Sequence, residues 1–158
     1  RRMFANNDSI TEKEKAERTE RFGKLDRLDT EVYTREAHRI LEEMLQEEPK
    51  DRRWTSEVES FIRENEGTEN YGGTKFEEVD CGTYLCKVVT LHDNTEAIDK
   101  FLSIGAQFGP FAGDQNGRKE FLENGQIRAT VYIARGVSNP APFREMHDRL
   151  IAWIDSQQ

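Results

Sequence analysis

The most constraining feature of the sequence is the dipeptide Asn124-Gly125, which stands between two segments that have the pattern of strands. This dipeptide is typical of a tight type I′ turn. In the segment that follows it, polar or small residues alternate with an apolar set, namely Ile127, Ala129, Val131 and Ile133. Alternation of this kind predicts a strand with one buried and one mixed face. We therefore predict a β-hairpin over residues 118–135.

A second hairpin is predicted around the two cysteines. Segments 75–81 and 83–91 have the composition of strands. If the four residues between Cys81 and Cys86 form the loop, the two side chains face each other at a distance that permits a disulfide. A persistent disulfide implies an oxidising compartment. Reduced thiols, a redox-active pair and a zinc site are the alternatives, although CxxC spacing and further zinc ligands at suitable spacing are missing.

Helical patterns surround the two hairpins. A capping box at Ser56 to Glu59 predicts a helix that also includes Trp54, and Asn94 is a suitable cap for a helix between the hairpins. A last helix is predicted after Pro140 and Pro142. The expected fold class is α+β, with a four-stranded antiparallel sheet made from two β-hairpins and helices packed on one face.

Residues 1–50 form a strongly charged segment, for which we predict two helices. The first begins at a capping box over residues 9–12, and the second is capped near Asp29 or Thr30 and ends before Pro49. An apolar stripe on the second helix indicates either core contact or half of a helical dimer seam. The predicted organisation is a helical extension or stalk over 1–50 and an α+β domain over 51–158.

The pattern around the cysteines resembles one found in uncharacterised proteobacterial envelope proteins. In that group a helix led by a tryptophan precedes a strand ending Val-x-Cys, and a second strand begins Cys-x-Val. Here Trp54 leads the helix, Val79-Asp80-Cys81 ends one strand, and Cys86-Lys87-Val88 begins the next. The resemblance covers residues 54–92. It implies a secreted or membrane-tethered location in the bacterial envelope, periplasmic or extracellular. No activity is assigned to that group, so the resemblance implies none for this chain.

Composition argues against several classes of protein. The net charge is −8, whereas a generic nucleic-acid binder needs a concentrated basic face. No apolar run is long enough to cross a bilayer, so we expect no direct membrane insertion of this chain. It opens Arg1-Arg2-Met3, which is compatible with a signal or anchor having been removed. No calcium loop or phosphate loop is recognisable, and no metal or cofactor is expected.

Two groups of side chains are candidates for contact with a partner. Aromatic residues that fall in or beside predicted loops and edges either anchor a partner or plug the core; these are Tyr71, Tyr84, Phe108, Phe111 and Phe121. A modest basic patch is predicted on the second hairpin, from Arg118, Lys119, Arg128 and Arg135. Such a patch suits a protein contact better than a nucleic-acid groove.

Catalysis has a weaker basis in the sequence. His92-Asp93 closes a predicted strand just before a helix cap, where a histidine beside a carboxylate can act as a general base. His38 is expected to be exposed and His147 partly buried. We therefore expect a non-enzymatic protein-interaction module, binding another protein or associating with itself through the N-terminal helices. The alternatives are a small hydrolase or transferase with a site near His92 and Asp93, and an acidic cytosolic regulator or inhibitor.

Overall fold

The computed structural model describes residues 11–107, 109–135 and 141–158. Short 3-10 turns, η1 to η3, lie between some of the longer elements. The helices and strands are α2 Glu12–Asp26, α3 Thr30–Glu47, α4 Arg52–Asn65, β1 Thr74–Cys81, β2 Leu85–His92, α5 Thr95–Ser103, β3 Gln115–Phe121, β4 Ile127–Ala134 and α6 Pro142–Ser156.

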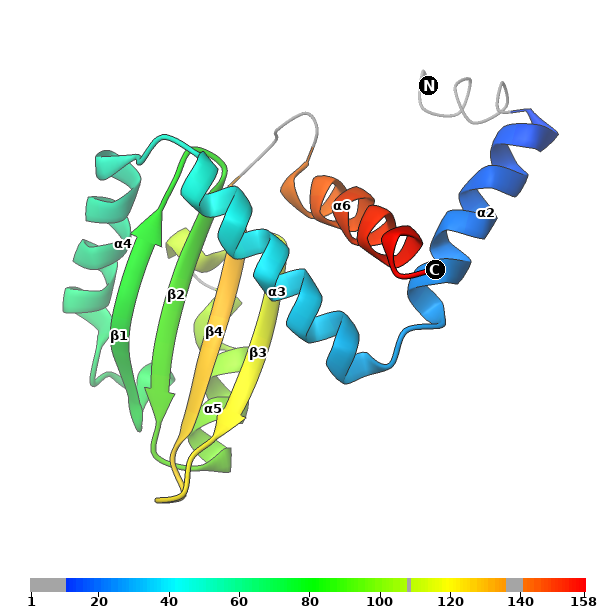
Figure 1. The fold of residues 1–158 in the computed structure, drawn as a ribbon. Helices are drawn as coiled ribbons and strands as arrows, with labels where there is room; N and C mark the ends of the chain where they lie inside the picture. Colours follow the sequence, from blue (N-terminus) through cyan, green and yellow to red (C-terminus); the bar gives the residue numbers. More distant parts are fainter. Residues whose placement is uncertain (1–10, 108, 136–140) are drawn as a thin grey trace.

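Within the described residues, four strands form one antiparallel sheet in the order β1-β2-β4-β3 (Figure 1). The predicted α+β class and the sheet built from two hairpins are confirmed. The hairpins join through β2 and β4, which pair in register from Leu85 with Ala134 to His92 with Ile127. Consequently β1 and β3 are the edge strands.

Helices cover both faces of the sheet, where the sequence predicted helices on one face. In Figure 1, α3 crosses in front of the sheet and α5 lies behind it. The face behind carries the alternating apolar residues of β4, which pack with α4 and α5 around Trp54, Val58 and Phe101. The last four residues of β4 are all buried, so this end of the strand is covered on both sides. Buried and partly buried residues alternate strictly only in the first half of β4, where one face of the strand is not covered by a helix.

Helix α3 belongs to the core. Its apolar stripe packs with Leu85, Tyr132 and residues of α6, and Ala37, Leu41 and Leu45 are fully buried. Of the two readings of that stripe, core contact is the one observed. The predicted extension over 1–50 is therefore wrong for α3, because its apolar residues complete the second face of the sheet. Helix α2 packs on α6, where Lys24 Nζ lies 2.8 Å from Asp155 Oδ1.

The helix caps follow the sequence at α3 and α5 but not at α2 and α4. The cap of α2 is Thr11, whose hydroxyl accepts from the Glu14 amide, so this helix begins inside the predicted capping box. Asp29 accepts a hydrogen bond from the Glu31 amide at the start of α3, and Asn94 accepts one from the Ala97 amide at the start of α5. Helix α4, however, begins before the predicted capping box. Its cap is Asp51, whose carboxylate accepts from the Trp54 amide at 3.0 Å.

The turn of the second hairpin is not of type I′. Gly125 has φ +89°, but no described non-glycine residue has positive φ, so Asn124 does not adopt the conformation that a type I′ turn requires. The amides of Leu122 and Gly125 bond to Gln126 O and Leu122 O, respectively. This is a three-residue loop that closes with a bulge at glycine. The hairpin itself is confirmed.

Candidate functional site

The five predicted contact aromatics do not form one surface. Tyr71 and Phe111 are only 2% and 1% exposed, because they pack edge-to-face on Phe61 in the core behind the sheet. The prediction that these two contact a partner is therefore wrong. Tyr84 and Phe121 are 49% and 72% exposed, but they lie at opposite ends of the sheet. Phe108 lies outside the described residues.

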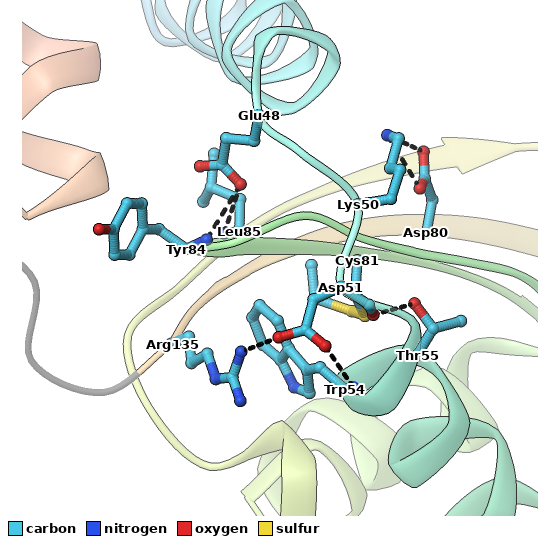
Figure 2. Close-up of a disulfide and its surroundings, with 11 residues drawn as sticks. Glu48, Lys50, Asp51, Trp54, Thr55, Asp80, Cys81, Tyr84, Leu85 and Arg135 are labelled. Carbon is cyan, nitrogen blue, oxygen red and sulfur yellow. Dashed lines mark hydrogen bonds and ion pairs between the residues drawn. A yellow bond between two sulfur atoms is a disulfide. The ribbon is translucent and has the colours of Figure 1, made fainter.

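The first hairpin is closed by a disulfide between Cys81 and Cys86, which are directly paired in the strand register. The α3–α4 linker wraps this end of the hairpin (Figure 2). We call this set of contacts the hairpin clasp. It comprises four hydrogen bonds. Glu48 Oε2 accepts from the amides of Tyr84 (3.0 Å) and Leu85 (3.2 Å), Thr83 Oγ1 donates to Pro49 O, and the Asp51 amide donates to Cys81 O.

Asp51 extends the clasp toward β4. Its carboxylate caps α4 and also accepts from Arg135, whose guanidinium lies 4.8 Å from the centre of the Trp54 ring (Figure 2). The bond from the Trp54 amide, followed by that from Arg135, lowers the pKa of Asp51. Arg135 is thus occupied here and does not join the predicted basic patch.

The geometry at His92 does not support a general base. The side chain is fully buried, and its two ring nitrogens lie 2.8 Å from Thr74 Oγ1 and 2.7 Å from Thr90 Oγ1. Burial lowers its pKa to about 4, against the opposing charge of Asp93. Because both nitrogens already have partners and no face is exposed, substrate has no route to them. His92 is therefore a buried, hydrogen-bonded side chain of the core.

The clearest candidate site is a cleft of about 600 Å³ between α3 and the open part of the front face. Helical spacing places Arg35, Arg39 and Glu42 along the side of α3 that overhangs the sheet, and alternation places Lys87 and Tyr132 on the floor below. We call this the cationic cleft. Six cationic residues line it: Arg35, Arg39, Lys87, Arg118, Lys119 and Arg128.

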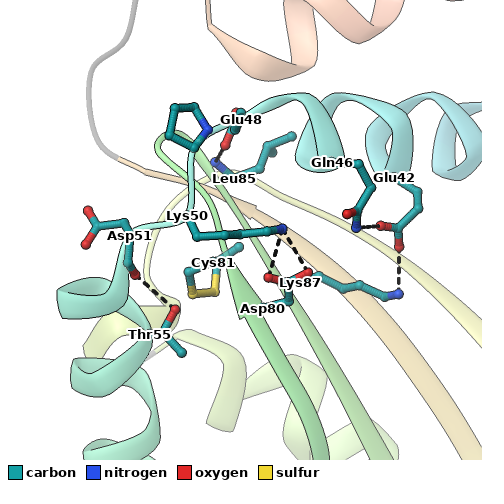
Figure 3. A network of polar contacts seen from close by, with 12 residues as sticks. Glu42, Gln46, Glu48, Lys50, Asp51, Thr55, Asp80, Cys81, Leu85 and Lys87 are labelled. Atoms are coloured by element: carbon teal, nitrogen blue, oxygen red, sulfur yellow. Dashed lines mark hydrogen bonds and ion pairs between the residues drawn. A yellow bond between two sulfur atoms is a disulfide. The ribbon is translucent and has the colours of Figure 1, made fainter.

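One end of the cleft is neutralised by an internal network (Figure 3). Lys87 Nζ lies 2.6 Å from Glu42 Oε1, which also accepts from Tyr132 OH, while Gln46 donates to the other oxygen of Glu42. Burial works against ionisation of Glu42, but the bonds from Lys87 and Gln46 outweigh it, so the pKa of this carboxyl is lowered. For Lys87, burial is likewise outweighed by Glu42 and the pKa is raised. This pair fixes α3 on the sheet.

The other end of the cleft has cations without such partners. Arg39 pairs with Glu36 and Glu43, and Arg128 pairs with Glu77 at 2.9 Å. Arg118 and Lys119, by contrast, form no ion pair with any other described residue. Both are exposed on β3. The free positive charge of the cleft is therefore concentrated at its β3 side.

His38 forms part of the cleft wall and is not exposed as the sequence predicted. It is only 7% exposed, its Nε2 lies 2.8 Å from Asn116 Oδ1, and its ring packs edge-on against Tyr132. Burial lowers its pKa, and the charges of Arg118 and Lys87 act in the same direction, whereas the bond with Asn116 opposes them. A neutral His38 therefore ties α3 to β3.

Sequence reasoning found only part of this site. It predicted that Arg118, Lys119 and Arg128 share a patch, and the structure brings all three to the cleft. It missed Arg35 and Arg39, because residues 1–50 were assigned to a separate extension. The available signal was their four-residue spacing, which places both on one side of α3.

Two other kinds of site are absent from the described part of the chain. There, no group of three or more His, Cys, Asp or Glu side chains is arranged to hold a metal ion. No described helix is long and apolar enough to span a bilayer. What the cleft can do chemically is bind a negatively charged group, through charge-assisted bonds from guanidinium and ammonium donors.

Comparisons with known proteins add no assignment. No family model, curated protein or solved structure matches the chain. The resemblance to envelope proteins stays a prediction.

Proposed function

We propose that the protein is a non-enzymatic interaction module that binds an acidic segment of another protein in the cationic cleft. The observation that carries the proposal is the pair Arg118 and Lys119, which lack anionic partners among the described residues although the protein has a net charge of −8. Other exposed cations, such as Lys13 and Arg144, also form no ion pair with a described residue, but Arg118 and Lys119 are the two that line the cleft. Arg118, on the cleft side of β3, suits a carboxylate supplied from outside, and Lys119 next to it on the edge strand adds positive charge nearby.

The rest of the cleft favours a protein ligand over a nucleic acid. Glu42 and Glu120 also line it, and its floor includes Val89, Thr130 and Tyr132. A phosphate backbone, with charge at every nucleotide, would meet these carboxylates as well as the cations. A polypeptide can place carboxylates only where the cations lie and small apolar groups elsewhere.

We further propose an oxidising location in the bacterial envelope. The disulfide that closes the first hairpin supports such a compartment, because cytosolic thiols are kept reduced. The test is a thiol count by mass spectrometry on protein alkylated, as isolated from its cells, before and after reduction. Cysteines that become accessible only after reduction support this location, whereas two freely alkylated thiols contradict it.

The binding proposal is tested with a defined probe, a fluorescent short peptide of alternating glutamate and threonine. We expect binding that weakens with added salt, and that weakens about tenfold or more in the double variant Arg118→Gln/Lys119→Gln. The matched control is Lys13→Gln/Arg144→Gln, which removes the same charge from exposed positions of α2 and α6 outside the cleft. This control should bind like the parent protein.

Three outcomes would overturn the proposal. One is equal weakening in both double variants, which would indicate a general effect of net charge. Another is equal binding of a peptide with glutamine in place of glutamate. The third is tighter binding of a single-stranded oligothymidylate, which would assign the cleft to nucleic acid.

A further inference from the structure

The two edges of the sheet differ in how many of their outward backbone groups are hydrogen-bonded or covered by other parts of the chain. At one end of β1 the Phe76 amide donates to Glu66 Oε2, and at the other end Cys81 O accepts from the Asp51 amide. A bulge between Phe76 and Glu78 interrupts the strand, and α4 lies alongside it (Figure 1). Native sheets commonly block an edge in these ways. The β1 edge is therefore closed to another strand.

The β3 edge has none of these features in the described residues. Its register with β4 is uninterrupted, and most of its residues are exposed. The bonds from Leu122 N to Gln126 O and from Ala134 N to Asp114 O fix which residues face β4. In an antiparallel ladder, residues whose backbone groups bond to the neighbouring strand alternate with residues whose backbone groups point away from it. Asp114 and Leu122 are of the first kind. The backbone groups that point away from the sheet are therefore those of Gln115, Gly117, Lys119 and Phe121.

A groove runs beside this open edge. It has a volume of about 600 Å³ and lies between the first turns of α3 and the middle of β3. Gly117, Arg118 and Lys119 form its sheet side, and these same two cations line the cationic cleft. The opposite wall carries Asp29 and Glu31. A uniformly charged polyanion would be repelled by that wall, whereas a peptide strand can place its carboxylates next to Arg118 alone.

We propose that the acidic segment of the partner binds as an extra antiparallel strand on β3, with its carboxylates on the face of Arg118. This inference rests on the proposed function and specifies how the ligand is held. The added strand would bond to the outward backbone groups of Gly117 and Lys119. Its alternate side chains would then enter the cationic cleft, so main-chain bonds supply affinity and the charges select the sequence.

The alternating glutamate–threonine peptide tests the geometry through its own backbone. With the glutamates on the face of Arg118, antiparallel addition turns the threonine amides toward β3 and the glutamate amides away from it. Methylating the threonine amides should therefore weaken binding about tenfold or more, while methylating the glutamate amides should leave it within about twofold. Equal effects of the two methylation patterns, or the reverse order, would overturn strand addition.

A second variant probes the protein side of the same contact. Gly117→Pro removes one outward amide, at an edge position where proline is tolerated. Its matched control is Gly117→Ala, since a Cβ at this position would meet Val131 and Thr130 only at ordinary contact distances of 3.6 and 3.8 Å. We expect the proline variant to bind about tenfold more weakly and the alanine variant to bind like the parent protein.

Hydrogen exchange on the unmodified protein provides a readout that does not depend on any variant. Addition of the peptide should slow exchange of the Gly117 and Lys119 amides. Protection of these amides that rises with protein concentration in the absence of peptide would assign the edge to a second copy and overturn the proposal. Salt-sensitive binding that requires Arg118 and Lys119 but protects neither amide would keep the proposed function and overturn strand addition. No binding of the peptide at all would overturn both.

Discussion

The hairpin β1–β2 is closed by a disulfide, bonded to the α3–α4 linker and covered along its outer edge, whereas β3–β4 has none of these features in the described structure. Both hairpins are followed by a helix and both contribute one central strand to the sheet. They differ in what their polar groups do. In the first hairpin these groups bond to the rest of the chain; in the second, Arg118, Lys119 and one edge of the backbone remain available to a ligand.

This difference indicates that the first hairpin stabilises the fold while the second carries recognition. The two are coupled through α3. Its C-terminal end is held by the hairpin clasp through Glu48, and its middle is held over the sheet by the pair Glu42 and Lys87. The shape of the cationic cleft therefore depends on contacts made by the first hairpin.

The largest contrast between the hairpins should appear when one apolar side chain is removed from each. Leu85→Ala deletes a fully buried side chain of β2 under α3 and should lower the free energy of unfolding by about 4 kcal/mol. Phe121→Ala removes a side chain that is 72% exposed on β3 and should change it by less than about 0.5 kcal/mol. Urea denaturation of both variants measures the difference. Similar losses would show that the second hairpin is as tightly integrated as the first.

The first hairpin should also make stability depend on pH through His92. In the unfolded chain this imidazole titrates near its ordinary pKa of about 6.5. In the folded protein burial lowers the pKa to about 4. Between these values only the unfolded chain takes up the proton, so the free energy of unfolding should fall by about 3 kcal/mol as pH drops from about 6.5 to about 4, with no further loss from His92 below that.

Urea denaturation across this pH range, compared with His92→Gln, isolates that contribution. The variant lacks the titrating group, so its stability should decline less steeply with falling pH, whatever its stability at neutral pH. Parallel pH profiles for the two proteins would contradict the assignment of His92 as a neutral core side chain.

Removing the disulfide should have a smaller effect than Leu85→Ala or the protonation of His92. By the chain-entropy argument, the short loop closed by Cys81 and Cys86 contributes about 2 kcal/mol, and the double variant Cys81→Ala/Cys86→Ala should lose about that much. Thermal unfolding of the parent protein with and without a reductant provides the matched comparison, because it breaks the cross-link without changing the side chains. If reduction leaves the unfolding temperature unchanged, the clasp is held by its hydrogen bonds alone.

A smaller effect than that of the disulfide is expected at the turn of the second hairpin. Gly125 has φ +89°, and a Cβ added to it would meet no atom within 4 Å, so Gly125→Ala should cost about 1 kcal/mol from backbone conformation alone. Gly125→Asn should cost less, since asparagine adopts positive φ more readily. Urea denaturation of the two variants compares them. An equal cost would indicate that contacts, rather than conformation, select glycine here.

Much of the secondary structure could be predicted because its signals are local. Asn94 and Asp29 were recognisable as caps, and the alternating residues of β4 and the separation of Cys81 from Cys86 indicated paired strands. The type of turn at Asn124-Gly125 was not predictable in the same way. The same dipeptide fits both a two-residue loop and a three-residue loop with a bulge, and the strand register selects between them.

The candidate site was harder to predict because its residues come from segments far apart in the chain. Arg35 and Arg39 on α3 meet Arg118 and Lys119 on β3 only after the helix has crossed the sheet. Aromatic residues in or beside predicted loops gave a misleading signal, since Tyr71 and Phe111 fill the core beneath the irregular segments that contain them.

The sequence by itself determined the two hairpins, the cysteine pairing that their register allows and the helices between them, because spacing along the chain sets caps, alternation and turns. Tertiary structure alone decided that α3 covers the second face of the sheet, that one edge is closed and the other open, and that Arg118 and Lys119 line a cleft without an ion-pair partner among the described residues. Burial, edge exposure and charge pairing depend on which distant segments of the chain come into contact, and local sequence patterns do not specify those contacts.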